Sequence, residues 1–351
     1  MEHFRIKLPH PILSQNIVFS APKRVEFRAA ELAAPTANQI TLRTEYSLIS
    51  TGTETIVLNG EFEPGSHWDN WVKYPFYPGY CAVGVVESIG EKVSRFAVGD
   101  RLAARTKHAQ FALVDESDAR LVKVPKGIAI EDVPWFGMAC IAQIGVRRAA
   151  HELGDAVVIV GAGLLGQLVT QYCRLFGARE IIVIDTAPKR LELAVAHGAT
   201  KVLCCGVQDA KEQVLELTSG RGADVAYGIT GHPAVFAPAL GLARRFGKVL
   251  LLGDAARPHE QHLTSDVISR GVQIIGAHDG YPPTIASDRD RWSHAAMTEL
   301  FFTYLQQGRM RVGDLVSHHF APEQAPHAYE MLLRDRSTAL GVLFDWTKHT
   351  V

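Results

Sequence analysis

The sequence lacks any apolar run that approaches the roughly 20 residues needed to cross a bilayer, and its longest apolar runs have the length of a strand. Its first residues contain no apolar core of signal-peptide length. The 36 Lys and Arg residues nearly balance the 37 Asp and Glu residues, giving a net charge of −1. Electrostatics therefore give no reason to expect nucleic acid or a membrane as partner. We expect a cytoplasmic protein that acts on a small molecule.

Cysteine is also scarce. The five cysteines are odd in number and scattered without the spacing of a disulfide framework, at Cys81, Cys140, Cys173, Cys204 and Cys205. We interpret them as reduced thiols that pack mostly as small apolar groups. The sequence also contains no internal repeat and no low-complexity tract.

The 351 residues divide into two regions with different hydrophobic patterns, and this length suits two domains. Residues 1–140 are predicted to be rich in strands, because 39–50 alternates apolar and polar residues and 79–90 is β-branched between glycines. From Ile144 onward, buried strands alternate with helical stretches. This alternation predicts an α/β fold with a doubly wound parallel sheet.

Hydrophobic periodicity predicts the individual helices and strands from Ile144 onward. We expect helices at 164–178 and 188–199, and strands at 156–163, 179–185, 201–204, 224–228, 248–252 and 272–275. The final stretch of about 65 residues returns to a mixed pattern, with a helix near 292–307 and a strand at 339–345.

The most specific motif is a glycine pattern directly after the 156–160 apolar strand. Gly161 permits a tight turn, Gly163 lets the backbone approach a pyrophosphate, and Gly166 allows close packing of helix on strand. Leu164 and Leu165 then open a helix whose free N–H groups favour phosphate. We interpret the pattern as a dinucleotide-binding turn.

Asp185 ends the second strand, where a carboxylate accepts hydrogen bonds from the adenosine ribose and repels a 2′-phosphate. This favours NAD over NADP, although the nearby Arg190 leaves some use of NADP open. Later strands are followed by Thr230 with Gly231 and by Gly253, at the edge where such a sheet binds its ligand. We expect these residues to contact the cofactor; the alternative is that they are ordinary turn residues.

These motifs, together with Gly84–Gly90, Val98–Leu102 and Gly247–Gly253, resemble the medium-chain dehydrogenase/reductase superfamily over essentially the whole chain. The resemblance implies a GroES-like catalytic domain over 1–145 and 285–351 and a Rossmann NAD-binding domain over 146–284. It also implies a homodimer or homotetramer.

Relatives with a catalytic zinc carry Cys, His, and Cys or an acid at three positions that here read Thr51, Tyr80 and Gly137. A zinc ion needs such ligands, so we expect no metal. A structural-zinc cluster of four cysteines is missing as well. The Ser-Thr-Gly-Thr-Glu variant is similar to a zinc-lacking subgroup that includes bacteriochlorophyllide and sugar dehydrogenase-like proteins.

Without zinc, side chains must accept the substrate proton and stabilise the developing charge. The resemblance places Thr53 at the proton-relay position, and Tyr80 at the lost histidine, where a nearby cation could lower its pKa. Glu54 is a candidate base or a helix-start residue. His278, and less so His108, could transfer protons. Each candidate also has a purely structural alternative. The Thr53 hydroxyl could bond to the backbone, Tyr80 could be a packed aromatic residue, and the histidines could have no role in catalysis.

The loop 65–77 combines aromatic and polar residues and, in relatives, borders the substrate mouth. His67, Trp68 and Trp71 suit a polyol or sugar, which needs flat apolar contacts and hydrogen-bond partners. Anchoring of the loop or a subunit contact is the alternative.

Three functions fit the sequence. A zinc-free NAD-dependent alcohol, polyol or sugar dehydrogenase is favoured. A zinc-free reductase of activated double bonds is second, although that class usually prefers NADPH. A non-catalytic nucleotide-binding protein is third.

Overall fold

The computed structural model describes residues 11–348. By the contacts among its residues the chain divides into two compact units. The first unit contains residues 11–60, 73–137 and 283–348, and the second contains Glu61–Val72 and Met138–Pro282. The segment Glu61–Val72 thus groups with the second unit, whereas the predicted range 1–145 placed it in the other domain.

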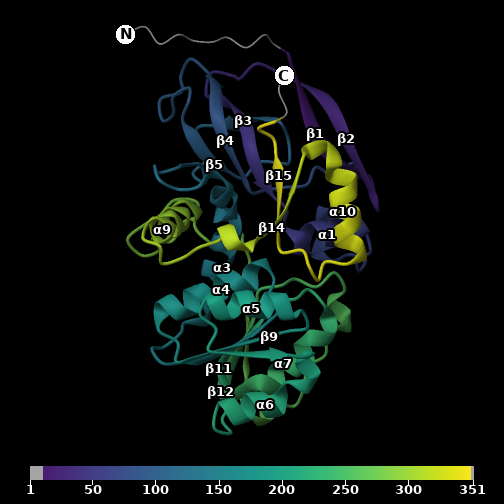
Figure 1. Ribbon diagram of the computed structural model, residues 1–351, viewed down its shortest axis with the longest axis vertical. Helices are drawn as coiled ribbons and strands as arrows, with labels where there is room; N and C mark the ends of the chain where they lie inside the picture. Colours follow the sequence, from purple (N-terminus) through teal and green to yellow (C-terminus); the bar gives the residue numbers. More distant parts are fainter. Residues whose placement is uncertain (1–10, 349–351) are drawn as a thin grey trace. The chain divides into compact units, whose positions relative to one another are not determined.

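The second unit is built on a six-stranded, all-parallel sheet in the order β10-β9-β8-β11-β12-β13 (Figure 1). This is the doubly wound order 3-2-1-4-5-6 of dinucleotide-binding folds. The order reverses between β8 and β11, and ligands bind at the carboxyl ends of such strands. The strands are β8 (Ala156–Val160), β9 (Glu180–Asp185), β10 (Lys201–Cys204), β11 (Ala223–Gly228), β12 (Ala243–Leu251) and β13 (Gln273–Gly276).

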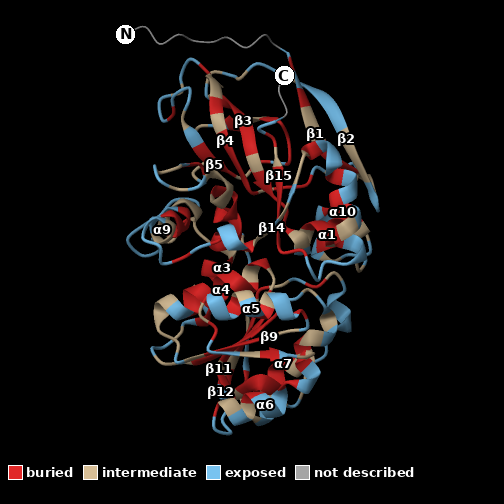
Figure 2. Cartoon of the chain, in the orientation of Figure 1, coloured by how far each residue is buried: buried red, intermediate tan, exposed pale blue. Residues whose placement is uncertain are grey.

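Helices cover this sheet because its central strands are apolar on both faces. All five residues of β8 are buried, and the central strands are drawn as buried in Figure 2. Helix α4 packs on β8 and β9, α5 on β9 and β10, and α7 on β11 and β12. The helices are α2 (His67–Trp71), α4 (Leu164–Phe176), α5 (Pro188–Ala196), α6 (Lys211–Leu217), α7 (Phe236–Leu242) and α8 (Asp266–Ser269), while α3 (Phe136–Ala149) begins at the end of the first unit.

The first unit is the β-rich domain. Its main sheet runs β14-β15-β3-β4-β5-β7, with β6 paired to β3, and a separate hairpin joins β1 to β2. Its strands are β1 (Ile12–Ala21), β2 (Arg24–Leu32), β3 (Gln39–Leu48), β4 (Ala82–Ile89), β5 (Arg101–Ala104), β6 (Phe111–Asp115), β7 (Val122–Lys123), β14 (Val316–Phe320) and β15 (Gly341–Asp345); its helices are α1 (Thr51–Asn59), α9 (His294–Gln306) and α10 (Ala325–Arg334).

The predicted fold class, an α/β Rossmann sheet plus a β-rich GroES-like domain, is confirmed. The region predicted as a loop, 65–77, is in part helical: α2 begins after Ser66, whose side chain accepts a hydrogen bond from the Asp69 N–H and so caps the helix. Thr53 lies inside α1 rather than in a strand turn. Among residues 11–348, no helix is long and apolar enough to cross a membrane.

Candidate active site

The glycine turn of the second unit connects β8 to α4. Gly161 has φ +104°, which L side chains rarely adopt. A Cβ on Gly166 would lie 1.9 Å from the Gly161 carbonyl oxygen, so helix and turn touch backbone to backbone. A Cβ on Gly163, in contrast, would meet nothing within 4 Å. The turn is therefore packed tightly on its inner side and open at Gly163.

The open side of the turn is the N-terminus of α4. The first N–H groups of a helix have no partner within the helix, and Gly163, the N-cap, offers no side chain to bond them. Leu164 is buried, while Leu165 is partly exposed. Together with the positive end of the helix dipole, these N–H groups form a cradle that suits a pyrophosphate.

Asp185 lies at the carboxyl end of β9 and is bonded to the turn. Its two oxygens accept hydrogen bonds from the N–H groups of Ala162 at 2.7 Å and Ala187 at 2.8 Å. A carboxylate has about four acceptor positions, so two backbone donors leave capacity for the hydroxyls of a ribose. Asp185 therefore lies at the predicted strand end with acceptor capacity left; its contact with a ribose stays a prediction.

Gln167 contacts the glycine turn, although the sequence did not single it out. Its side-chain amide donates to the carbonyl oxygens of Ala162 at 3.1 Å and Arg190 at 2.8 Å, which ties the turn to α5. The only signal in the sequence was a polar residue on the apolar face of α4. This contact uses the Arg190 backbone carbonyl; a contact of the Arg190 side chain with a cofactor stays a prediction.

The later cofactor candidates lie on neighbouring strand ends. A Cβ on Gly161 would meet the Thr230 methyl group at 2.9 Å, so the segment after β11 touches the turn. A Cβ on Gly253 would lie 2.1 Å from the Ile229 carbonyl oxygen. The backbone after β12 therefore contacts the backbone after β11 at the edge of the sheet, beside the turn. Gly231 follows Thr230 in the same segment.

In the first unit, Tyr80 lies beside Ser50 and Thr53. The phenol donates a hydrogen bond to the Ser50 Oγ at 2.7 Å, and the Arg105 guanidinium lies 5.7 Å from the centre of the ring. Burial raises the pKa of Tyr80 well above its ordinary value, and the hydrogen bonds with Ser50 and Thr53 only partly oppose that shift. The phenol is thus protonated near neutral pH, contrary to the expectation that a cation lowers its pKa.

Glu54, in the first turn of α1, is buried and fully engaged. Its carboxylate accepts hydrogen bonds from the Ser50 N–H at 2.8 Å, from the His108 ring at 3.1 Å and from the Tyr329 hydroxyl. Since Ser50 also bonds Tyr80, Glu54 holds in place the residue that contacts the phenol. Of the two roles predicted for Glu54, the structure shows the helix-start position; the role of a base stays a prediction.

The tautomer of His108 follows from its neighbours. The Trp346 N–H can only donate, so the Ser47 Oγ accepts it at 3.0 Å. Because the Glu54 carboxylate can only accept, the His108 Nε2 carries a proton and donates a hydrogen bond to it at 3.1 Å. In a neutral imidazole Nδ1 is then an acceptor, so the Ser47 hydroxyl donates to it at 2.8 Å. Each of these buried groups has a hydrogen-bond partner, as a low-dielectric interior requires.

The three positions that hold zinc in relatives carry no suitable ligands. Thr51 and Tyr80 offer hydroxyls, and a Cβ on Gly137 would lie only 2.3 Å from the Cys81 sulfur, so no longer side chain fits there. Zinc sites use thiolate, imidazole or carboxylate ligands, and these positions do not fit one. No group of three His, Cys, Asp or Glu side chains within residues 11–348 is arranged to hold a metal ion.

The predicted substrate residues lie in the second unit. His67 stacks on Trp71 with ring centres 6.0 Å apart and meets His278 edge to face at 5.7 Å. Trp68 is 5% exposed and Trp71 is 43% exposed. The structure therefore brings His278 together with His67, and it brings Tyr80 together with Thr53 and Glu54 in the first unit.

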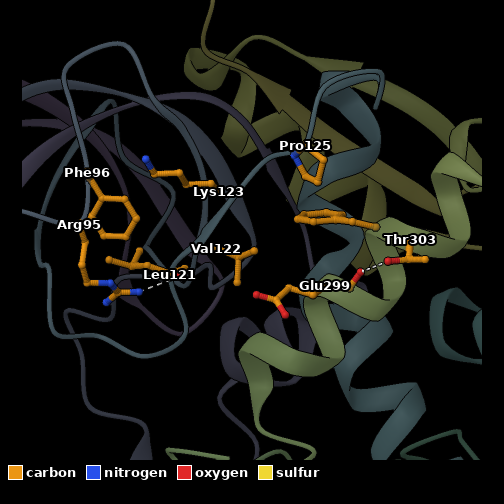
Figure 3. A pocket seen from close by; sticks show the side chains of 9 residues that line it. Arg95, Phe96, Leu121, Val122, Lys123, Pro125, Glu299 and Thr303 are labelled. Atoms are coloured by element: carbon orange, nitrogen blue, oxygen red, sulfur yellow. Dashed lines mark hydrogen bonds between the residues drawn. The ribbon is translucent and has the colours of Figure 1, made fainter.

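A separate pocket of about 480 Å³ opens in the first unit between β7 with its neighbouring loops and α9 (Figure 3). Arg95 and Lys123 both lie over the ring of Phe96, and Glu299 and Thr303 line the opposite wall. Lys123 also pairs with Asp100 at 2.7 Å. None of the predicted site residues lines this pocket.

The fold and the turn define a dinucleotide-binding oxidoreductase architecture. Comparison with protein families agrees: residues 37–181 match the alcohol dehydrogenase GroES-like domain, and residues 165–295 match the zinc-binding dehydrogenase domain. The chain belongs to the zinc-type medium-chain dehydrogenase/reductase family.

Two curated relatives extend this similarity. The D-guloside 3-dehydrogenase of Escherichia coli K12 is 25% identical over 353 residues, covering 94% of this chain and 100% of the relative. The sorbitol dehydrogenase of Bacillus subtilis is 25% identical over 304 residues, covering 78% of this chain and 81% of the relative.

Two solved structures share the fold. A zinc-binding dehydrogenase from Sinorhizobium meliloti bound to NADP has a TM-score of 0.78 at 18% identity, covering 95% of this chain and 99% of its own. An alcohol dehydrogenase from E. coli CFT073, complexed with NADH, has a TM-score of 0.78 at 19% identity with the same coverage.

Proposed function

We propose that this chain is an NAD-dependent oxidoreductase that acts on the CH–OH group of a polyol, a sugar or a related secondary alcohol, without a catalytic zinc ion. The observation that carries the proposal is the glycine turn of the second unit, open at Gly163 and bonded to Asp185. The names of the curated relatives, which act on a guloside and on sorbitol, support the substrate class.

The residues of the turn would hold the cofactor. The N–H groups of Leu164, Leu165 and Gly166 would bind the pyrophosphate, and Asp185 would accept hydrogen bonds from the adenosine ribose. When bound, the nicotinamide ring supplies the acceptor of a hydride from the carbinol carbon. A carboxylate at Asp185 repels a 2′-phosphate, which supports NAD; because the solved relatives hold NADP in one case and NADH in the other, both cofactors belong in the test.

The proton balance of the reaction gives roles to the first unit. As the carbinol C–H bond breaks with its electron pair, the O–H bond must release a proton while the C=O bond forms. Thr53 and Tyr80 provide hydroxyls that would bond the substrate oxygen. Each can take up the released proton only as it passes its own proton on, so Thr53, Tyr80 and Ser50, which Tyr80 contacts, would relay the proton to solvent water. Because the pKa of Tyr80 is raised, the phenol stays protonated and passes the proton on without storing it, and Glu54 acts as a positioning residue through Ser50.

The proposed independence of zinc is supported by the ligand positions themselves. Gly137 cannot carry a side chain without moving Cys81, and Thr51 and Tyr80 are not the ligands that zinc selects. The cytoplasmic location and the homo-oligomer stay predictions.

A substrate screen tests the proposal. Purified protein is incubated with NAD or NADP and a panel of polyols, sugars and aromatic alcohols, and in reverse with NADH or NADPH and ketones or enones. We expect NADH formation from a polyol or sugar, and activity that survives exhaustive chelation. Turnover of enones alone, or one stoichiometric zinc ion whose removal abolishes turnover, would contradict it.

A further inference from the structure

A cluster of aromatic, imidazole and carboxylate groups lies in the second unit, away from the glycine turn in sequence. We call it the Asp254 cluster: it contains Asp254, His67, His278, Trp68 and Trp71. The members come from α2, from the segment after β12 and from the segment after β13. Three separate parts of the chain therefore converge on one carboxylate.

The two indole side chains of the cluster differ in their burial and their ring contacts. Trp68 is buried, stacks on Phe62 with ring centres 6.3 Å apart and lies 5.8 Å from Trp71. Trp71 is exposed, and its ring is parallel to His67 within 12°. Trp68 thus anchors α2, while Trp71 presents an aromatic face to solvent.

Asp254 faces both imidazoles. Partial burial raises the pKa of its carboxyl group, and the nearby His67 and His278 oppose that shift. A hydrogen bond with the Trp68 indole also lowers this pKa, which places the indole N–H beside the carboxylate. The Trp68 Nε1 is buried and makes no hydrogen bond of ordinary geometry within residues 11–348, so its contact with Asp254 is a weak one.

The chemistry of this set points to a ligand rich in hydroxyls. A carboxylate accepts from two neighbouring hydroxyls, and imidazole and indole nitrogens supply the complementary donors. A flat ring such as Trp71 packs against the C–H face of a sugar. A metal ion fits less well, because no three His, Cys, Asp or Glu side chains in the described chain are arranged as ligands.

We propose that the Asp254 cluster is the subsite that binds the polyol or sugar, with Asp254 as the acceptor for a pair of neighbouring hydroxyls and Trp71 as the stacking surface. This inference rests on the proposed function and deepens it by assigning the residues that select the substrate class. It gives His278 the role of a hydroxyl-binding residue, in place of the proton-transfer role predicted from the sequence.

Direct binding tests the subsite without relying on turnover. Saturation-transfer NMR and calorimetry measure binding of D-sorbitol and of a methyl glycoside to the full-length protein, with and without NADH. In Asp254→Asn, which keeps the shape and removes the charge, the Kd for the polyol should rise about tenfold or more, because hydrogen bonds to charged groups are the strong ones. Trp71→Ala should also weaken binding, while the Kd for NADH stays the same.

A matched control is Asp209→Asn, because Asp209 is an exposed residue of the same unit whose carboxylate accepts a hydrogen bond from the neighbouring Gln208 side chain. If Asp254→Asn fails to fold, His67→Gln tests the same surface. Polyol affinity unchanged in these variants, or no polyol binding by the wild type, overturns the inference. Binding without turnover contradicts only the proposed function, and turnover with an unchanged KM in Asp254→Asn contradicts only the subsite.

Discussion

The carboxylate of Asp185 accepts a hydrogen bond of 2.7 Å from the backbone N–H of Ala162, inside the glycine turn. The residue predicted to bind the ribose therefore also holds the turn predicted to bind the pyrophosphate. The two halves of the proposed nucleotide site are thus physically coupled, and a change at Asp185 acts on both.

We expect Asp185→Ser to weaken NADH binding by about tenfold or more, because two charge-assisted backbone contacts and the ribose contact are lost together. NADPH binding should suffer less, since the repulsion of a 2′-phosphate disappears. Fluorescence titration with both nucleotides measures the ratio. Glu192→Gln, an exposed change on α5, is the control; an unaltered preference in Asp185→Ser would speak against the assignment.

Glu54→Gln should destabilise the first unit. The carboxylate accepts from Ser50, His108 and Tyr329, and a glutamine amide must turn an NH₂ group toward at least one of these donors. An unsatisfied buried group costs about 1–3 kcal/mol. Urea unfolding followed by circular dichroism measures the loss, with Glu330→Gln, on the exposed side of α10, as control. Equal stability of the two variants would rule out a stabilising network around Glu54.

Tyr80→Phe should lower kcat by about a hundredfold and leave the Kd for NADH unchanged, because a positioned proton-transfer group contributes about that much. Since burial raises the pKa of Tyr80, the pH profile of the wild type should show no ionisation of this phenol between pH 6 and pH 9. Tyr77→Phe, at an exposed tyrosine, provides the comparison. Wild-type kcat in Tyr80→Phe would remove this residue from the mechanism.

Stability should fall in alkaline solution. Burial raises the pKa of Tyr227 and of Tyr329 well above the ordinary value of 10.0, so the folded chain keeps protons that the unfolded chain releases. The free energy of unfolding therefore decreases as pH rises past about 10, by up to about 1.4 kcal/mol per pH unit for each tyrosine. Unfolding in urea between pH 8 and pH 11 measures the slope, which Tyr227→Phe should make shallower; an unchanged slope would show that Tyr227 is not a cause of the alkaline loss.

Much of the second unit could be predicted from the sequence, because its signals are local. The buried strand β8, the glycines after it and Asp185 all lie within one continuous stretch, and β10 matches its predicted range of 201–204. A fully apolar run of strand length is typical of a strand covered on both faces, and glycine is the residue that a turn at positive φ favours.

The contacts that the sequence did not predict are long-range ones. Tyr329 is 275 residues from Glu54, and Trp346 is 299 residues from Ser47. No periodicity links such positions, so the buried chain of hydrogen bonds around Glu54 could be found only in the folded structure. The same holds for Asp254, which in the sequence is a plain residue after a strand and which the fold brings to the indoles of α2.

The open position at Gly163 gives the most direct test of the dinucleotide site. Its φ of −73° and ψ of −166° suit any residue, and a Cβ there meets nothing within 4 Å, so Gly163→Leu should fold with wild-type stability. NADH titration of this variant should show binding lost, because the new side chain occupies the place of the pyrophosphate. A stable Gly163→Leu protein that binds NADH as tightly as the wild type would contradict the dinucleotide site and the redox function built on it.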